Sequence, residues 1–308
     1  MPTNVYSFAN DRLAPVDLPA SKPLRWADWH PNGSYCLIVG NGGAALRFDG
    51  KRLEAIDTGT KHNLRGAAFS SDGSRALLCG NRGALLLLED GTVRTIASGT
   101  TENLRRIAWR PQGDSALVIG NSGTVLRYDA STDAVTPVPG DRAHTLRAIA
   151  WRPDGTYALV GAYASKWAGY PRPHPLYKCD GVYLQSLLHS DDEDDFVAVD
   201  WHPDGRRALI AGYAYSSRGA SNKLLSYDGS GFSYQAVEAS GALLGAAWHP
   251  SGDHALLCGE NGVLLKYSES SVEQLASATS DNLVGPFWRP DGSSALLLLG
   301  PSERVYTV

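Results

Sequence analysis

One sequence pattern occurs seven times in this chain and constrains its fold more than any other feature. Each copy begins with an aromatic residue, continues through a variant of x-Pro-Asp-Gly, and runs into a short apolar segment. The copies are separated by 40, 40, 42, 50, 47 and 40 residues. A period near 40 residues with frequent turn residues is typical of a β-propeller. The seven aromatic anchors are Trp29, Phe69, Trp109, Trp151, Trp201, Trp248 and Trp288.

The unit that contains Phe69 divides into four short segments at its turn residues. We expect strands over residues 64–69, 75–79, 84–88 and 93–96. The second and third segments are unbroken apolar runs, which are typical of strands covered on both faces. Four antiparallel strands make one propeller blade. The sequence therefore predicts an all-β, seven-bladed β-propeller forming a single domain over residues 1–308, with the anchors packed between adjacent blades.

The last unit is incomplete, so a segment from the other end of the chain must finish its blade. Residues 14–18 stand where fourth strands stand before the other anchors, which predicts that an N-terminal strand closes the ring. Two segments compete for the third position of this blade, residues 304–308 and residues 5–8. We expect residues 304–308 to take it, with residues 5–8 as the alternative.

Composition limits the classes of partner. The formal net charge of -4 argues against a nucleic-acid binder that relies on overall charge. The N-terminus lacks the pattern of a signal peptide, and no apolar run has membrane-spanning length, so we expect a cytoplasmic protein without a membrane partner. No Cys-x-x-Cys spacing occurs, so we expect no metal site and no cofactor, and four buried thiols in a reducing compartment. The cysteines are Cys36, Cys79, Cys179 and Cys258.

Blades four and five depart from the repeat at one place. Residues 162–177 and residues 212–222 replace the short Gly-Asn-x-Gly turn between the second and third strands. Both insertions carry aromatic and arginine residues, the types that dominate interface hot spots. The alternative is tolerated loop growth without function. The candidate binding residues here are Trp167, Tyr170, Arg172, His174, Tyr213 and Tyr215.

Four arginines form a second candidate site because they share one repeat position. Each stands four residues before its anchor, in the first strand that lines the central channel. One half of the channel mouth would then be cationic, which suits an anionic group or an acidic peptide. The alternative is inheritance from an ancestral blade, with each side chain bonded to the adjacent loop. These residues are Arg25, Arg65, Arg105 and Arg147.

Motifs of known catalytic or metal chemistry are absent from the sequence. It contains no Gly-x-Ser-x-Gly, phosphate loop, Gly-x-Gly-x-x-Gly or His-Glu-x-x-His. The acidic run over residues 190–195 is interpreted as a solvated charge run, because Phe196 stands where a calcium loop has its turn glycine. The titratable residues that could serve an enzyme at the channel axis are His144 and His174 with residues 191–195.

The Trp-x-Pro-Asp-Gly turns resemble those of bacterial WD40-like propellers, including the repeats of TolB-type proteins. This sequence lacks the Gly-His and Trp-Asp dipeptides of true WD40 blades. The resemblance implies a seven-bladed ring that displays binding surfaces, usually for other proteins, although fold alone does not define function. We expect a non-enzymatic scaffold for a protein partner. The alternatives are a binder of a small anionic ligand or carbohydrate at the channel mouth, and a lyase or hydrolase at the axis.

Overall fold

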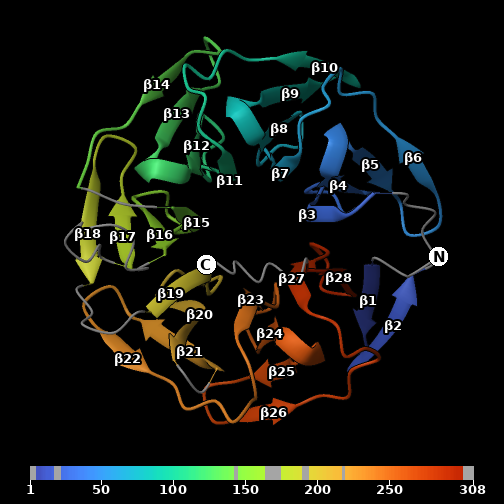
Figure 1. The fold of residues 1–308 in the computed structure, drawn as a ribbon, viewed down its shortest axis with the longest axis vertical. Coiled ribbons are helices and arrows are strands. Elements are labelled where there is room, and N and C mark those ends of the chain that lie inside the picture. Colours follow the sequence, from blue (N-terminus) through green and yellow to red (C-terminus); the bar gives the residue numbers. More distant parts are fainter. Residues whose placement is uncertain are drawn as a thin grey trace.

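Seven four-stranded antiparallel sheets are arranged as blades around a central axis (Figure 1). The computed structural model describes residues 5–16, 22–141, 145–163, 175–188, 194–216 and 219–300. In each blade the first strand lies innermost and the fourth lies at the rim (Figure 1). The all-β, seven-bladed prediction is confirmed.

The first three blades follow the chain in order. Blade 1 consists of β3 (Leu24–Trp29), β4 (Cys36–Gly40), β5 (Ala45–Phe48) and β6 (Leu53–Ala55). Blade 2 consists of β7 (Leu64–Phe69), β8 (Arg75–Gly80), β9 (Leu85–Glu89) and β10 (Thr92–Thr95). Blade 3 consists of β11 (Leu104–Trp109), β12 (Ser115–Gly120), β13 (Val125–Asp129) and β14 (Val135–Pro137).

The next three blades continue in the same order. Blade 4 consists of β15 (Leu146–Trp151), β16 (Ala158–Ala162), β17 (Leu176–Cys179) and β18 (Leu184–Leu188). Blade 5 consists of β19 (Asp194–Trp201), β20 (Ala208–Ser216), β21 (Gly219–Tyr227) and β22 (Phe232–Tyr234). Blade 6 consists of β23 (Leu243–Trp248), β24 (Ala255–Gly259), β25 (Leu264–Tyr267) and β26 (Val272–Gln274).

Blade 7 joins the two ends of the chain and corrects one prediction. It contains β27 (Leu283–Trp288), β28 (Ala295–Leu299), β1 (Val5–Ala9) and β2 (Arg12–Val16), in that spatial order. The N-terminus therefore supplies both the third and the fourth strand, and the preference for residues 304–308 in the third position is wrong. Val5 faces Leu298 and Phe8 faces Ala295, so β1 buries its apolar residues in the place where other third strands do. Residues 304–308 lie outside the described residues.

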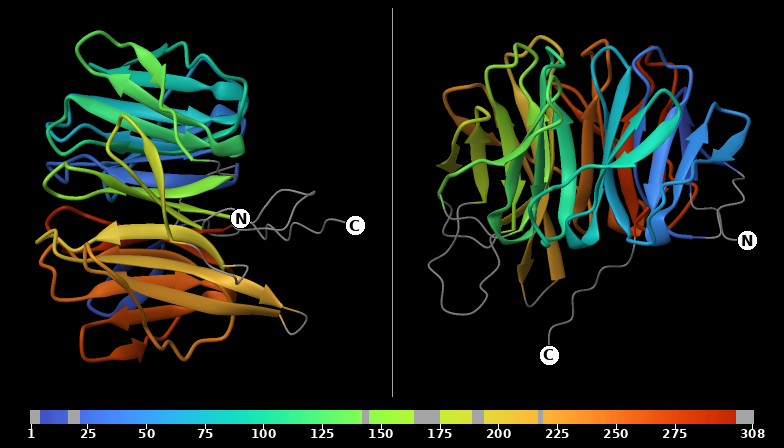
Figure 2. Two further views of the ribbon diagram at one scale, coloured as in Figure 1. Left: turned by 90° about the vertical axis from the view of Figure 1, so that its left-hand side faces the viewer. Right: turned by 90° about the horizontal axis from the view of Figure 1, so that it is seen from above.

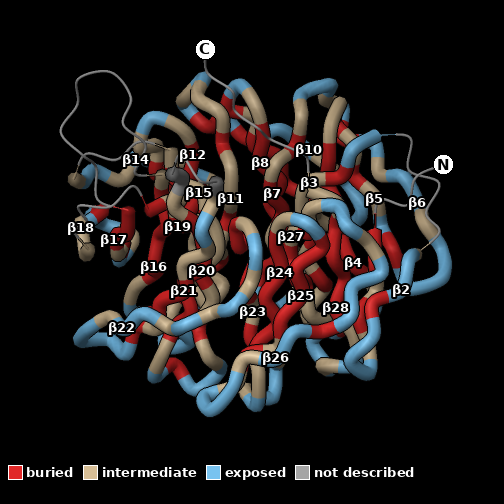
Figure 3. Tube along the Cα trace, turned by 60° about the horizontal axis from the view of Figure 1, so that its bottom comes forward, coloured by how far each residue is buried: buried red, intermediate tan, exposed pale blue. Residues whose placement is uncertain are grey.

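The anchors pack between adjacent blades, as predicted. Trp109 is 8% exposed, and its Nε1 donates to the carbonyl oxygen of Ala68 in blade 2 (2.9 Å). Trp151 makes the same bond to Ala108 (3.1 Å). The second strands are buried along almost their whole length (Figure 3), and apolar clusters lie between each blade and the next. The four cysteines are free and buried.

Short 3₁₀ turns connect the second and third strands of the four regular blades 1, 2, 3 and 6. They are η1 (Asn41–Gly43), η2 (Asn81–Gly83), η3 (Asn121–Gly123) and η4 (Glu260–Gly262). Gly83 has φ +69°, and a Cβ on it would overlap the carbonyl oxygen of Thr100. No helix in the described part of the chain is long and apolar enough to cross a membrane.

In five of the seven blades, the residue after the anchor bonds the next blade on the face opposite the 3₁₀ turns. Arg152 Nε donates to the carbonyl oxygen of Gly205 (2.9 Å). His202 Nε2 lies 3.0 Å from the equivalent oxygen of Gly252, while its Nδ1 accepts from the backbone N–H of Asp204 (3.2 Å). Nδ1 also lies 2.7 Å from Oδ1 of Asp204, so both ring nitrogens have polar partners. His and Arg can replace each other at this position because both present an N–H to the same carbonyl group, whereas Ser70 of blade 2 bonds within its own blade.

Candidate functional site

The connections between second and third strands lie on one face of the ring, which we call the insertion face. Figure 2 shows the hairpin of β20 and β21 projecting beyond the other blades on this face. Its strands have nine residues each, and their pairing continues to Ser216 opposite Gly219. The blade 5 insertion is thus an extended hairpin rather than a loop. Antiparallel pairing satisfies its backbone groups without help from the rest of the ring.

The structure places only part of the predicted aromatic site. Trp167, Tyr170, Arg172 and His174 lie outside the described residues, and so does the side chain of Tyr215 on β20. Tyr213 also lies on β20 but is only 8% exposed. It faces Asp195 across the sheet. Burial raises the pKa of Tyr213, and a hydrogen bond with Tyr163 and the charge of Asp195 act in the same direction.

The four predicted arginines do not behave alike. In the first three blades each guanidinium Nε donates to the asparagine that begins the 3₁₀ turn of the same blade. The bonds join Arg25 to Asn41 (2.9 Å), Arg65 to Asn81 (2.9 Å) and Arg105 to Asn121 (2.8 Å). Each of these arginines therefore holds the adjacent turn, which is the geometry that inheritance from an ancestral blade predicts.

Arg147 is different because blade 4 has no Asn-x-Gly turn. Its guanidinium lies over the ring of Tyr163, 4.7 Å from the ring centroid. Tyr163 follows β16, and its backbone N–H donates to the carbonyl oxygen of Thr145 (3.1 Å). Arg147 and Tyr213 therefore belong to one cluster, because both contact Tyr163. This cluster joins the two predicted sites at the boundary of blades 4 and 5.

The acidic run requires a correction at its end. Asp194 is completely buried rather than solvated. Its Oδ1 lies 3.1 Å from Lys223 Nζ, and its Oδ2 accepts a hydrogen bond from the hydroxyl of Tyr234 (3.2 Å). A buried carboxylate is tolerated only with such partners. His144, His174 and residues 191–193, which the enzyme alternative needs, lie outside the described residues.

Arg106 lies in the central channel and was not expected there from the sequence. Its guanidinium lies 3.8 Å from the ring centroid of Trp26, and its Nη1 donates to the carbonyl oxygens of Arg65 and Arg105 (2.7 and 2.8 Å). Its Nε is fully buried and has no acceptor among the described residues. Burial lowers the pKa of Arg106 to about 9, and the charge of Arg147 acts in the same direction.

The channel beside Arg106 contains a cavity of about 200 Å³. Small residues of blades 4 to 7, such as Ala148, Ala198 and Gly245, form much of its wall. The repeat alignment could have revealed this site, because Trp26 and Arg106 stand three residues before their anchors, where the other blades have Gly or Ala.

Two buried carboxyl groups were also missed. Asp28 and Asp200 stand directly before their anchors, and each accepts a hydrogen bond from the backbone N–H of the next anchor, Phe69 (2.8 Å) or Trp248 (2.7 Å). Burial raises the pKa of each to about 7, and these backbone bonds oppose the shift.

Among the described residues, no group of three or more His, Cys, Asp or Glu side chains is arranged so that it could bind a metal ion. No protein-family model and no curated protein matches this chain. What the structure establishes is the architecture, a seven-bladed β-propeller of four-stranded blades.

Proposed function

We propose that this chain is a non-enzymatic binding module that recognises a protein partner through the insertion face. The observation that carries the proposal is the departure of two adjacent blades on one side of this face. The projecting hairpin of β20 and β21 and the Arg147, Tyr163 and Tyr213 cluster lie together there. Buried Tyr213 and the half-buried Tyr163 and Arg147 hold the base of this surface in one geometry, which lowers the entropic cost of binding.

The residues that would contact the partner are those of the blade 4 insertion. Trp167, Tyr170, Arg172 and His174 belong to types that supply large contact area or paired charge at interfaces. Tyr215 would extend this surface onto blade 5. Propellers commonly serve as binding scaffolds, and we propose a relationship with the WD40-like, TolB-type propellers on that basis. The buried free cysteines support a cytoplasmic location.

A capture experiment tests this function. The intact protein, a Trp167→Ala/Tyr170→Ala variant and a Val182→Ala/Tyr183→Ala control are each immobilised and exposed to lysate of the native organism. The control removes exposed side chains (71% and 46%) from a turn on the opposite face. We expect a protein retained in a defined ratio by the intact bait and the control but lost from the first variant, with equal melting temperatures. Equal retention by all three baits would contradict the assignment to the insertion face.

A second candidate function is supported by Arg106. A buried guanidinium without a carboxylate partner among the described residues is costly, and a small anion in the 200 Å³ channel cavity would offset that cost. This candidate retains the predicted anionic ligand but moves it from the arginines at the channel mouth to Arg106. If no bait retains a protein, the binding of a small anion becomes the favoured function.

A further inference from the structure

At four of the interfaces between blades, two aromatic rings of the same blade pack against each other. The anchor tryptophan packs edge to face against a second ring, which comes from the third strand of the same blade. The ring centroids are 5.5 to 6.1 Å apart, and the interplanar angles are 71° to 82°. In the strand register the second ring always lies opposite an alanine of the second strand. The pairs are Trp109–Tyr128, Trp201–Tyr227, Trp248–Tyr267 and Trp288–Phe8.

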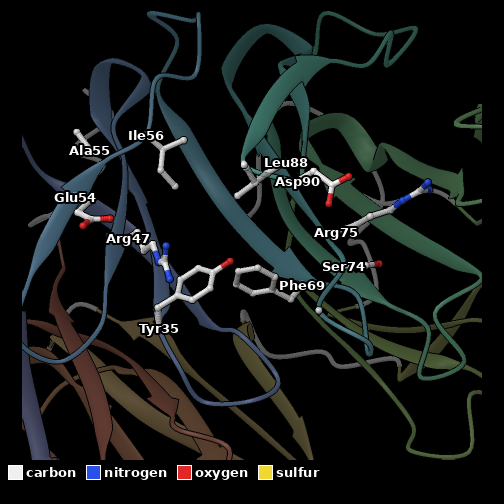
Figure 4. A pocket seen from close by; sticks show the side chains of 12 residues that line it. Tyr35, Arg47, Glu54, Ala55, Ile56, Phe69, Ser74, Arg75, Leu88 and Asp90 are labelled. Atoms are coloured by element: carbon white, nitrogen blue, oxygen red, sulfur yellow. The ribbon is translucent and has the colours of Figure 1, made fainter.

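Blade 2 departs from this pattern at both positions. Its anchor is Phe69 rather than tryptophan, and Leu88 stands opposite Ala76, where the second ring would be. Both replacements are smaller than the residues they replace. A cavity of about 400 Å³ lies at this place, between blades 1 and 2 (Figure 4). This volume is within the range of ligand pockets.

The wall of the cavity is aromatic and aliphatic inside and charged at its rim. Phe69 and Leu88 are both 8% exposed, and the ring of Tyr35 packs edge to face on Phe69 with centroids 5.6 Å apart. The guanidinium of Arg47 lies 4.3 Å from the centroid of the Tyr35 ring. Figure 4 shows Asp90 near Leu88, and this exposed carboxylate lies beside the mouth.

The interface between blades 2 and 3, where both rings are present, shows which side chain fits the position of the second ring. There the second ring belongs to Tyr128, which is completely buried. Its hydroxyl donates a hydrogen bond to the carboxylate of Asp133, in the turn between the third and fourth strands. In blade 2 the corresponding turn carries Asp90, so an acceptor is again present. Among the described residues, the third strand of blade 2 therefore supplies no ring to this place, and the ring that contacts Phe69 is that of Tyr35 in the cavity wall.

We propose that the cavity between blades 1 and 2 binds the side chain of a tyrosine presented by a partner protein. The ring would pack between Phe69 and Leu88, and its hydroxyl would donate to Asp90 while accepting from Arg47. The cavity lies beside turns of the face opposite the insertion face. This inference therefore goes beyond the proposed function and does not depend on it.

The probe for this site is N-acetyl-tyrosinamide, which mimics a tyrosine within a polypeptide. We expect it to bind the intact protein with a dissociation constant of about 1 mM, a value typical of a fragment of this size. N-acetyl-leucinamide should bind at least tenfold more weakly, because it offers neither ring nor hydroxyl. Chemical-shift changes of the probe in NMR titrations measure both. No binding of the tyrosine probe, or equal binding of the two probes, would overturn the proposal.

Two variants fill the cavity from different sides. Leu88→Tyr restores the missing ring and Phe69→Trp restores the missing anchor, so each should weaken binding of the tyrosine probe at least tenfold. Val182→Tyr adds a tyrosine at an exposed position elsewhere and should leave binding unchanged. If one of these two variants does not fold, probe binding to the other tests the proposal. Retained affinity in a folded filling variant would show that the probe binds elsewhere.

A further probe distinguishes two possible ligands of the cavity, a tyrosine side chain of a protein and a free small phenol. The compound p-cresol has the same ring and hydroxyl without the flanking amide groups. Comparable binding of p-cresol and N-acetyl-tyrosinamide supports a docked side chain. Binding of p-cresol alone would overturn the protein partner, because the cavity would then exclude a ring attached to a polypeptide.

Discussion

Blades 3 and 5 are built on the same repeat but have different surfaces. In blade 3, Arg105 bonds Asn121 in a tight turn, and the indole of Trp151 donates to the carbonyl oxygen of Ala108. In blade 5, Val197 replaces the arginine and Asp200 replaces the alanine, and the turn becomes a long hairpin.

The anchor Trp201 is nevertheless buried as Trp109 is. The packing between blades thus tolerates changes on the faces as long as the anchors and the second strands keep their places.

Among the differences between blades 3 and 5, we expect Asp200 to have the largest effect on the free energy of unfolding. The unfolded carboxyl has a pKa near 3.8, and the folded one has a pKa of about 7. Between these values the folded state binds a proton that the unfolded state has released, so the free energy of unfolding falls as pH rises from 4 to 7. A shift of this size is worth on the order of 4 kcal/mol. Asp200→Asn keeps an acceptor for the Trp248 N–H without the charge.

The measurement is urea denaturation of the intact protein and Asp200→Asn at pH 5 and pH 8. We expect the variant to be the more stable protein at pH 8 and to lose less stability between the two pH values. Asp28→Asn should behave in the same way, since burial raises the pKa of Asp28 to about 7 as well. Identical pH dependence in the intact protein and both variants would show that these carboxyl groups titrate normally in the folded state.

A substitution in the 3₁₀ turn of a regular blade should have the next largest effect on the free energy of unfolding. Gly83 and Gly99 have nearly the same φ, +69° and +73°, but only at Gly83 would a Cβ overlap a neighbour, the carbonyl oxygen of Thr100. We expect Gly83→Ala to lower the free energy of unfolding by about 3 kcal/mol, against about 1 kcal/mol for Gly99→Ala. Thermal melts compare the pair. Equal losses would mean that the turn has room to change, and that its recurrence in blades 1, 2, 3 and 6 has another cause.

We expect the smallest loss in the free energy of unfolding when the hydrogen bond between Arg105 and Asn121 is removed. Asn121→Ala removes the acceptor of Arg105 Nε and should cost about 1 kcal/mol. A double-mutant cycle with Arg105→Met isolates this bond from the other contacts of the arginine. A coupling energy near zero would mean that the arginines of blades 1 to 3 do not hold their turns, and it would strengthen the case for a role in binding.

Much of the fold could be predicted because the pattern is local and repeated. The candidate site was less predictable. Tyr213 was expected on a loop insertion, yet it is buried on β20, because the inserted residues continue the strands. Asp194 belongs to an acidic run in the sequence, but Lys223 and Tyr234 reach it only after β21 and β22 pair beside it.

The sequence by itself determined the number of blades, the anchors and the position of the irregular turns, because spacing and turn residues act within some forty residues. Only the tertiary structure decided which strand completes blade 7, because residues 5–8 and 304–308 have similar local preferences. It also decided that Arg106 stacks on Trp26 and that no described side chain fills the cavity beside Leu88. Those outcomes depend on side chains from different blades, whose meeting requires the closed ring.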